Sequence, residues 1–389
     1  MKSDLRCLLE DAGRYYGGVR KRVFPKADAK VAYGSDRYRQ RAFRTLEGIH
    51  PRSMRLRVVE VIQETPSTRT FRFDRLDGPV PPFRAGQYVS IGFTIGQVRT
   101  TRAYSISSPP GVGHLDITVR LKADGFVSPF LFEHVAVGWE VTTGGPTGSF
   151  VHEPLIDRGG LVLIAGGSGI TPFMSMIRHE ALCGWQHPID LVYGSRSAED
   201  VIFGDELQAL AASQGKLRYR RVISEPSPGY EGAVGLIDDA HIKALAGEVA
   251  GRSFLVCGPA MMYEHTLAEL AKLRVPAHKI RRELYGPPAD VTQTLGWPAD
   301  LSNETQVRVT VAGSLSFDAP IAEPLLNSLE RHGLPHRSSC RSGECADCRI
   351  RIVSGRTFEA SSCVRQSDRA LGYVHACVTY PLEDVLIEL

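Results

Sequence analysis

Long apolar runs and an export signal are both missing from this sequence. Asp4, Arg6, Glu10 and Asp11 interrupt the first apolar stretch, so we expect no signal peptide. No run approaches the roughly 20 apolar residues that a membrane-spanning helix needs. We therefore expect a soluble cytoplasmic protein without a transmembrane segment. In that compartment, clustered thiols bind metal more often than they form disulfides.

Internal repeats, low-complexity tracts and a large net charge are absent too. The 389 residues predict two to four domains, and 43% hydrophobic against 23% charged residues is typical of globular chains. The net charge is only +3, yet the first 54 residues carry 13 Lys or Arg against 6 Asp or Glu. This basic N-terminal extension, residues 1–54, could bind an acidic partner or a membrane surface, or form a solvated helical extension. No motif in it supports nucleic-acid binding.

Cysteine is scarce in the first 339 residues, which hold three, and concentrated in the last fifty, which hold five. Cys340, Cys345 and Cys348 follow the C-x4-C-x2-C spacing, and Cys377 comes later in the chain. This is the plant-type 2Fe–2S spacing, in which a tight loop gives three thiolates and a distant residue gives the fourth. Zinc is the alternative, but zinc ligands usually come as two C-x2-C pairs. Cys363 lies outside the pattern and is interpreted as a small buried hydrophobe.

Short strand patterns separated by Gly and Pro turns run from Arg55 to Phe150 and predict a small antiparallel β-barrel. One of its strands carries Arg102, Tyr104 and Ser105. These residue types suit a flavin, which needs a cation at its phosphate, an aromatic face against its ring and hydroxyl groups along its ribityl chain. An ordinary barrel strand can hold the same residues. The interpretation as a flavin site is therefore supported only by the loop that follows later in the chain.

Apolar runs alternate with helical stretches from Leu161 to Leu273 and predict an α/β domain with parallel strands. The first strand leads into the loop 166–172, where we expect Thr171 to cap a helix and Pro172 to take its first position. Free amides at such a helix start suit a pyrophosphate. The loop is not a G-x-G-x-x-G fingerprint. Residues 257–259, Cys-Gly-Pro, end a second strand at the edge where ligands of open α/β sheets bind.

A stretch without periodicity, residues 286–304, predicts a linker after Tyr285. Residues 306–317 then predict a hairpin around Gly313, and residues 324–333 predict a helix with a glycine stop. The cysteine cluster lies just beyond this helix. We therefore expect a third domain that holds the cluster.

In this order, the motifs resemble those of the ferredoxin-NAD(P) reductase superfamily, in its three-domain members with a C-terminal plant-type ferredoxin. Such proteins are reductase components of Rieske-type and other multicomponent oxygenases, of hydroxylases and of some desaturases. The resemblance covers about residues 55–389. It implies an antiparallel β-barrel flavin domain (55–152), an α/β parallel-sheet NAD(P) domain (153–285), a linker (286–304) and an α+β, β-grasp-like 2Fe–2S ferredoxin domain (305–389).

The resemblance also implies roles for individual residues. The residues expected at the flavin are Arg102, Tyr104, Ser105, Val119, Gly125, Val127 and Ser128. Those expected at the nicotinamide nucleotide are Gly166, Gly167, Ser168, Gly169, Thr171, Pro172, Ser195, Arg196, Cys257, Gly258 and Pro259. The catalytic set, near the flavin ring and the nicotinamide, is Tyr104, Ser105, Thr171, Cys257, Glu283 and Tyr285. The metal ligands are Cys340, Cys345, Cys348 and Cys377.

The choice of coenzyme rests on a few residues. Ser195 and Arg196 follow the second α/β strand, where Arg could clamp the 2′-phosphate of NADPH. However, Ser224 is followed by Glu225 where many NADPH enzymes carry a second basic residue. This favours NADH over NADPH, and the resemblance favours FAD over FMN.

The expected function follows from electron counting. NAD(P)H gives two electrons as a hydride, whereas an iron–sulfur cluster accepts one, so a flavin between them is needed. We expect electrons to pass from NAD(P)H to FAD, to the 2Fe–2S cluster and then to a separate protein, an oxygenase or hydroxylase. A cobalamin protein that needs reductive activation, a desaturase partner, and a redox-sensing module with little turnover are the alternatives.

Overall fold

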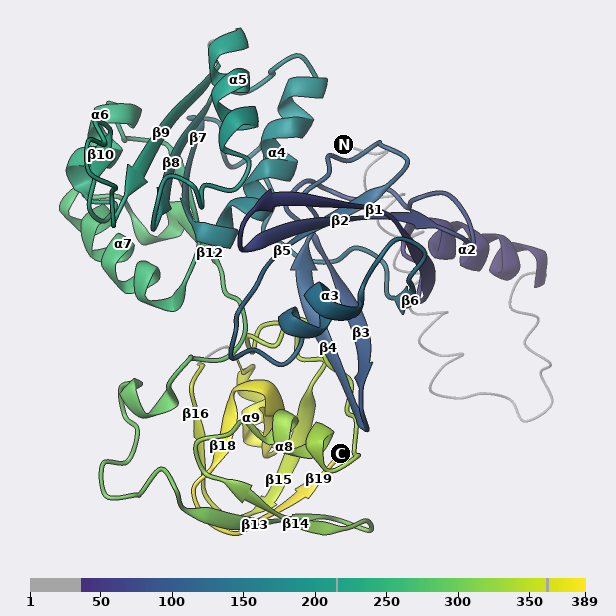
Figure 1. Ribbon diagram of the computed structural model, residues 1–389. Helices are drawn as coiled ribbons and strands as arrows, with labels where there is room; N and C mark the ends of the chain where they lie inside the picture. The colour runs from purple at the N-terminus through teal and green to yellow at the C-terminus, as the bar shows by residue number, and fades with distance from the viewer. Residues whose placement is uncertain (1–35, 215, 362–363) are drawn as a thin grey trace, which may run out of the picture. The chain divides into compact units, whose positions relative to one another are not determined.

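A computed structural model describes residues 36–389 of the chain, except 215 and 362–363 (Figure 1). The chain divides into two compact units, Met1–Ile49 and His50–Leu389. The first unit contributes helix α2 (Asp36–Ile49), and residues 1–35 of the basic extension lie outside the described residues, as does Cys363. Within the described part of the chain, no helix combines the length and the apolar character that a membrane span requires.

An antiparallel six-stranded sheet opens the second unit. Its strands are β1 (Met54–Thr65), β2 (Thr68–Arg75), β3 (Tyr88–Ile95), β4 (Val98–Ser105), β5 (Leu115–Arg120) and β6 (Glu140–Thr143), in the order β4-β3-β6-β1-β2-β5, with helix α3 (Ser128–His134) beside them. Alternate residues of β1 are buried in the core, as expected for a strand with one face in solvent. A bridge between Ile106 and Ile117 joins the two edges of the sheet, so it closes as a small barrel.

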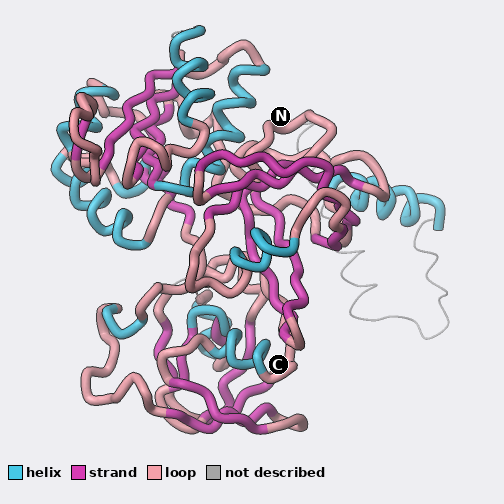
Figure 2. The backbone as a smooth tube through the Cα atoms, viewed as in Figure 1, coloured by secondary structure: helices cyan, strands magenta, loops and turns pink. Residues whose placement is uncertain are grey.

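A parallel six-stranded sheet follows, with helices on both faces (Figures 1 and 2). Its strands are β7 (Leu161–Gly166), β8 (Ile189–Ser195), β9 (Leu217–Ile223), β10 (Ala233–Val234), β11 (Ser253–Cys257) and β12 (Ile280–Glu283). Its helices are α4 (Ile170–Leu182), α5 (Gly204–Gln214), α6 (Asp239–Ala246) and α7 (Ala260–Lys272), with short 3-10 turns η1 (Gly167–Gly169) and η2 (Ala277–Lys279). Every residue of β7 is buried, which explains its continuous apolar run.

The strand order of this sheet, β10-β9-β8-β7-β11-β12, reverses direction at β7. The helix after β7 therefore packs on one face, with Leu163 and Phe173 in one core, whereas α7 packs on the other, with Ile164 and Leu270. A crevice at the carboxyl ends of β7 and β11 is the usual ligand site of such a sheet. Both the 166–172 loop and the Cys257–Pro259 segment lie there.

The second unit thus contains a barrel body and a parallel-sheet body. A mixed five-stranded sheet with one helix across it forms its third body. Its elements are β13 (Gln306–Val311), β14 (Ser316–Pro320), α8 (Leu325–Arg331), β15 (Arg349–Ser354), β16 (Thr357–Glu359), α9 (Gln366–Ala370), β17 (Tyr373–His375), η4 (Ala376–Val378), β18 (Thr379–Pro381) and β19 (Val385–Glu388). The main sheet has the order β14-β13-β19-β15-β17, in which β13 pairs with β14 antiparallel and with β19 parallel. The expected β-grasp-like fold is thus confirmed, together with the barrel and the parallel sheet.

The linker expected at 286–304 holds a short 3-10 turn, η3 (Val291–Gln293), and packs on the third body. The Trp297 ring meets Phe358 edge-on with 5.2 Å between ring centroids, and Tyr380 at 6.0 Å. Aromatic pairs of this geometry contribute about 1 kcal/mol each beyond the area they bury. The domain limits read from the sequence stay predictions.

Candidate functional site

Strand β4 carries a guanidinium group that lacks an anionic partner. Arg102 is partly buried, and its Nη1 donates to Thr100 Oγ1 at 2.5 Å and to the Thr101 carbonyl at 2.7 Å. Among the described residues, no carboxylate lies within ion-pair distance of it. Burial and the neighbouring Arg341 lower the pKa of Arg102 to about 10, so it keeps its charge at neutral pH. An unpaired, partly buried guanidinium fits a phosphate group, as expected for the flavin.

The hydroxyl group of Tyr285 joins the barrel to the parallel sheet. It forms a hydrogen bond with Ser105 Oγ, at the end of β4, over 2.9 Å, and accepts one from the thiol of Cys257, at the end of β11, over 3.2 Å. Cys257 is fully buried, whereas Tyr285 is 40% exposed and can present its ring to a planar ligand. Three residues of the predicted catalytic set are therefore in contact, although they are up to 180 residues apart in the sequence.

Tyr104 lies on the opposite face of β4 from its neighbour Ser105, because side chains alternate between the two faces of a strand. Its ring packs against the barrel core and meets Phe93 edge-on, with 6.4 Å between ring centroids and 84° between planes. Burial raises the pKa of the Tyr104 hydroxyl. Tyr104 therefore lies beside the Ser105–Tyr285–Cys257 contact without taking part in it.

Residues from three bodies line one cavity of about 650 Å³. Tyr88 comes from the barrel, Glu283 from the parallel sheet, and Cys340, Glu344 and Cys345 from the cysteine loop of the third body. Two predicted cluster ligands therefore lie on the same cavity as a predicted catalytic residue.

Glu283 is an unusual carboxyl group within this cavity. It is 8% exposed, and its Oε2 atom has no hydrogen-bond partner among the residues that the structure describes. Burial, followed by the negative charges of Glu344 and Cys340, raises its pKa to about 8. Glu283 therefore binds a proton more tightly than an exposed carboxyl group does. Its backbone carbonyl accepts a hydrogen bond from the Tyr263 hydroxyl, which fixes the end of β12.

The glycine loop after β7 brings two strand ends into close contact. A Cβ atom on Gly169 would lie 2.1 Å from the carbonyl oxygen of Cys257, and one on Gly166 would lie 2.3 Å from Met262 Sδ. Gly167 has a φ of +52° in the left-handed region. Glycine is thus required for this loop to pack on the Cys257–Pro259 turn. A glycine loop that leads into a helix start fits a pyrophosphate, although the Ile170 amide is already bonded to the Gly167 and Ser168 carbonyls.

The expectation that Thr171 caps helix α4 is wrong. The 3-10 turn η1 starts the helical winding early, so α4 begins at Ile170, and Gly169 takes the capping position without a side chain. Thr171 is instead buried inside the first turn, where its hydroxyl donates to the Ser168 carbonyl at 2.7 Å. Pro172 is consequently the third helical residue, where its missing N–H costs no helical hydrogen bond.

The remaining predicted flavin residues lie in β5 and around the start of α3. The Ser128 hydroxyl accepts a hydrogen bond from the Lys122 amide at 3.0 Å and donates to the Lys122 carbonyl at 3.3 Å. Gly125 packs closely on Lys122: a Cβ atom on this residue would lie 2.9 Å from the Lys122 carbonyl oxygen. Val119 and Val127 are buried in the barrel core. Ser128 therefore shapes the loop before α3 with the hydroxyl group that we expected to face a ligand.

Opposite charges meet at the ends of β8 and β9. Ser195 is buried and donates to the Asp200 carbonyl, whereas Arg196 is exposed. The Glu225 carboxylate lies 3.7 Å from Arg196 Nε, and its amide donates to the Arg196 carbonyl. Arg196 therefore faces a negative charge at the position where we expected a 2′-phosphate to bind.

The four predicted metal ligands lie in one place. Cys348 and Cys377 are buried, Cys340 and Cys345 are partly buried, and none of the four forms a disulfide. Hydrogen bonds from the Cys345 thiol and from Ser342 lower the pKa of Cys340, to about 4. The Ser342 and Cys345 amides both lie 3.4 Å from Cys340 Sγ. A thiolate surrounded by amide donors is the form that an iron–sulfur cluster binds.

The backbone of the cysteine loop is wound to place its amides around the sulfur atoms. Arg341, Gly343 and Ala346 all have φ between +56° and +85°, in the left-handed region. Alternation of right- and left-handed residues turns successive N–H groups toward one side and creates an anion-binding concavity. A Cβ atom on Gly343 would lie 2.9 Å from Val378 Cγ2, so glycine is required there. The donor set and the concavity fit a 2Fe–2S cluster.

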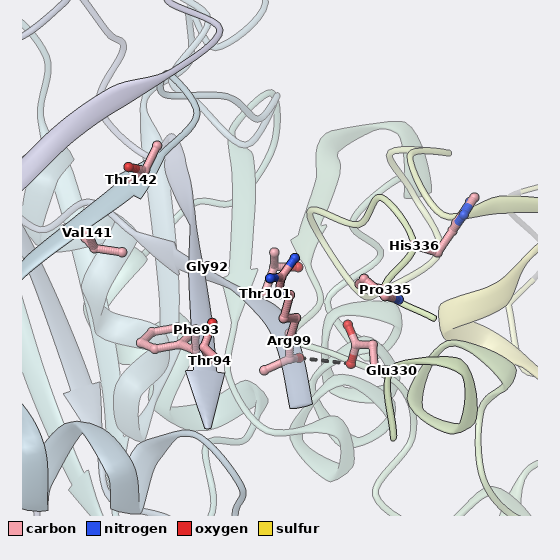
Figure 3. Close-up of a pocket in the computed structure, with 11 residues that line it drawn as sticks. Gly92, Phe93, Thr94, Arg99, Thr101, Val141, Thr142, Glu330, Pro335 and His336 are labelled. Carbon is pink, nitrogen blue, oxygen red and sulfur yellow. Dashed lines mark hydrogen bonds between the residues drawn. The ribbon is translucent and has the colours of Figure 1, made fainter. Parts of the chain in front are cut away.

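A polar interface joins this loop to the barrel. Thr100 of β4 donates to Glu330 Oε2 at 2.9 Å, and Glu330 pairs with Arg341 at 2.7 Å. Arg341 Nη1 also reaches Thr100 Oγ1 and the Thr101 carbonyl, both at 3.2 Å. Figure 3 shows Glu330 pointing from α8 toward β4, beside a cavity of about 330 Å³. Arg341 is next to a predicted cluster ligand, and Thr100 is two residues from Arg102.

This interface was not predicted from the sequence. Thr100, Glu330 and Arg341 are each under 6% exposed, and two of them are charged. Buried charges usually indicate a specific pairing, but no spacing rule connects residues that are 230 and 241 positions apart. Tyr88, which accepts a hydrogen bond from Ser339, escaped notice for the same reason.

Comparison with known protein families matches the three bodies in order. An oxidoreductase FAD-binding domain matches residues 55–152, an oxidoreductase NAD-binding domain matches residues 163–267, and a 2Fe-2S iron-sulfur cluster binding domain matches residues 309–382. The chain is therefore an oxidoreductase with FAD, nicotinamide-nucleotide and 2Fe–2S domains.

Similarity to individual proteins shows which family of oxidoreductases this chain belongs to. Ferredoxin–NADP reductase B of Sorangium cellulosum is 33% identical over 238 residues, which cover 59% of this chain and 96% of that protein. The glycine betaine monooxygenase reductase subunit of Chromohalobacter salexigens is 29% identical over 350 residues, covering 86% and 94%. The solved structure of phthalate dioxygenase reductase has a TM-score of 0.64 at 20% identity, covering 87% and 98%, which supports the three-body fold. The chain belongs to the ferredoxin-NAD(P) reductase family.

The glycine loop gives the first testable prediction. We expect Gly169→Ala to lower the free energy of unfolding by about 1–3 kcal/mol, because its Cβ atom would overlap the Cys257 carbonyl. The same displacement should weaken NADH binding. Thermal unfolding and equilibrium titration with NADH measure both effects. Gly113→Ala is the matched control, since nothing lies within 4 Å of its added Cβ atom. Equal behaviour of the two variants would contradict this account of the loop.

Proposed function

We propose that this chain is a reductase component that passes electrons from NADH, through FAD and a 2Fe–2S cluster, to a separate oxygenase protein. The three matched domains support the order of cofactors. The name of the glycine betaine monooxygenase reductase subunit, which aligns with 86% of this chain, supports an oxygenase as acceptor. The name of phthalate dioxygenase reductase points to the same class of partner.

The cavity shared by three bodies is the observation that carries the proposal. A flavin accepts two electrons from a nicotinamide and releases them one at a time to a cluster that takes one. Such a relay requires the flavin site to lie between the other two. In this chain the flavin strand β4 contacts Cys257 of the nucleotide sheet through Tyr285, and contacts the cysteine loop through Arg341.

The residues fit distinct roles in this relay. Arg102 would hold a flavin phosphate, and Ser105 and Tyr285 would flank the ring. Cys257 would face the nicotinamide, with the pyrophosphate on the amides of the loop at 166–169. Cys340, Cys345, Cys348 and Cys377 would bind the cluster. Because the chemistry resides in the cofactors, the protein's task is to place them and to exclude water.

The proposal first predicts that loss of the cluster affects reduction of cytochrome c but not reduction of ferricyanide. We expect purified protein to show flavin and iron–sulfur absorbance and to reduce both ferricyanide and cytochrome c with NADH. Cys345→Ser should remove the cluster, because serine lacks the thiolate ligand. Cytochrome c reduction should then fall by about tenfold or more, while ferricyanide reduction, which needs only the flavin, stays within about twofold.

Cys183→Ser is the control for this experiment, since Cys183 is exposed at the end of α4. Loss of the cluster without loss of cytochrome c reduction would overturn the relay. Negligible NADH turnover in protein with full cofactor content would instead favour a redox-sensing module. The protein that co-purifies with this chain, or that a neighbouring gene encodes, identifies the electron acceptor. If that protein is a cobalamin protein or a desaturase, the acceptor is not an oxygenase.

The polar interface between β4 and the cysteine loop generates a second prediction. Thr100→Val keeps the shape of the side chain but leaves Glu330 and Arg341 without their hydroxyl partner. We expect reduction of the cluster by the flavin to slow by about tenfold, because small displacements of reacting groups cost large factors in rate. Reduction of the flavin by NADH should be unchanged. Anaerobic stopped-flow absorbance follows the two steps separately.

Thr142→Val is the matched control for Thr100, since it lines the same cavity but is exposed. Flavin content is measured in each variant, because Thr100 also accepts a hydrogen bond from Arg102. If Thr100→Val and Thr142→Val reduce the cluster at the same rate, the interface has no part in the transfer.

Coenzyme preference gives a third prediction. We expect Glu225→Lys to raise the NADPH-to-NADH ratio of kcat/KM by about tenfold, because it frees Arg196 and replaces a repulsive charge near the 2′-phosphate. Steady-state kinetics with both coenzymes measure the ratio. Glu231→Lys makes the same charge change at another exposed position and should leave the ratio unaltered. An unchanged ratio in Glu225→Lys would show that the coenzyme is selected elsewhere.

A further inference from the structure

Three side chains that bind metals well meet at the junction between the barrel and the parallel sheet. His152 follows the barrel, Glu180 lies near the end of α4, and His187 precedes β8. Glu180 is ten residues from the start of α4, or about 15 Å along the helix axis. The cluster is therefore at the opposite end of α4 from the glycine loop, and none of its members has a part in the proposed electron relay.

The geometry of the three side chains suits a small cation. Glu180 Oε1 lies 3.0 Å from His187 Nδ1 and 4.0 Å from His152 Nδ1. One ligand atom from each residue lies within 4.8 Å of the other two. Ligand atoms about 2.0–2.1 Å from a zinc ion are separated by roughly 3–4 Å, so small rotations of the side chains would complete the site.

The charge of Glu180 lacks a permanent counterion. The residue is 7% exposed, and among the described residues its carboxylate meets no Lys or Arg. It accepts a hydrogen bond from the His187 amide at 3.0 Å and lies beside the two imidazoles. The guanidinium of Arg281, whose charge acts on His152, is paired with Asp157 at 2.6 Å. A buried carboxylate without a cationic partner costs several kcal/mol. A divalent cation between Glu180 and the imidazoles would remove this cost.

His152 adds a second, independent observation. Its Nε2 atom is buried and has no hydrogen-bond partner in the described part of the chain. Its ring meets that of His187 edge-on, with 4.6 Å between centroids. Buried polar atoms are almost always paired, so the unpaired Nε2 atom indicates that the His152 imidazole lacks a partner. The other ring nitrogen, Nδ1, is the one that lies 4.0 Å from Glu180 Oε1.

We propose that His152, Glu180 and His187 bind one Zn²⁺ ion, with water completing the tetrahedron on the exposed side of His187. Two histidines and one carboxylate are a common zinc donor set. The ion would fasten the segment that leaves the barrel to the end of α4, and so fix the FAD domain against the NAD domain. The site is structural and separate from the 2Fe–2S cysteines.

The test uses the full chain with FAD and cluster in place. After treatment with EDTA and desalting, the protein is titrated with ZnCl2 against a zinc-indicator dye, and bound metals are measured by mass spectrometry. We expect one zinc per chain in addition to two cluster irons, and a higher Tm with zinc. Glu180→Gln and His152→Gln should weaken zinc binding by about 100-fold or more and abolish the rise in Tm.

His179→Gln is the control, because His179 neighbours Glu180 on α4 but faces Cys183, at 3.8 Å. The iron count of each variant shows that zinc has not entered an empty cysteine site. If Glu180→Gln fails to fold, the more exposed His187→Gln takes its place. Absence of zinc binding, zinc binding that survives these substitutions, or zinc lost only in His179→Gln would each overturn the proposal.

Discussion

The hydroxyl group of Tyr285 is the contact that connects the candidate flavin site of the FAD domain with the candidate nucleotide site of the NAD domain. It binds Ser105 at the end of β4 and Cys257 at the end of β11, so one phenol fixes the distance between two strand ends. Each partner is at the position where its own domain would meet a ligand: Ser105 in the flavin motif and Cys257 at the reversal of the strand order. The partly exposed ring of Tyr285 remains free to cover a planar group.

The cysteine loop is held by a different kind of contact. Its interface with the barrel is polar, with Thr100, Glu330 and Arg341 buried together and Ser90 bonded to Ser339 at 2.7 Å. Buried ion pairs contribute little net stability but are costly to break, so they favour one orientation over others. A polar interface of this kind would hold the cluster domain in a fixed orientation without the large apolar area of a permanent interface. That suits the proposed function, in which this domain also passes an electron to another protein.

Local sequence patterns predicted much of the fold and the candidate site. The C-x4-C-x2-C spacing identified Cys340, Cys345 and Cys348, because a cluster constrains its ligands along the chain. Burial of β7 on both faces made its strand readable as an apolar run. Strand β9 was missed, because arginines at 218, 220 and 221 break the apolar pattern. The cap at Thr171 was mispredicted, since the need for glycine at 169 arises from the Cys257 carbonyl, a distant part of the chain.

Contacts that depend on tertiary structure could not be read in this way. Nothing in the sequence connects Thr100 with Glu330 and Arg341, or His152 with Glu180 and His187. These groups are recognisable only once burial and distance are known, because a buried charge matters through what lies next to it. The structure therefore adds most information at the junctions between domains, where residues far apart in the sequence are in contact.

The central claim is that electrons from NADH reach the cluster through the flavin within one chain. Anaerobic addition of NADH to the purified protein, followed by electron paramagnetic resonance at low temperature, tests it most directly. The account predicts the signal of a reduced 2Fe–2S cluster in the wild-type protein, and its absence when flavin has been removed from otherwise intact protein. A cluster that stays oxidised under NADH while the flavin is fully reduced would contradict it.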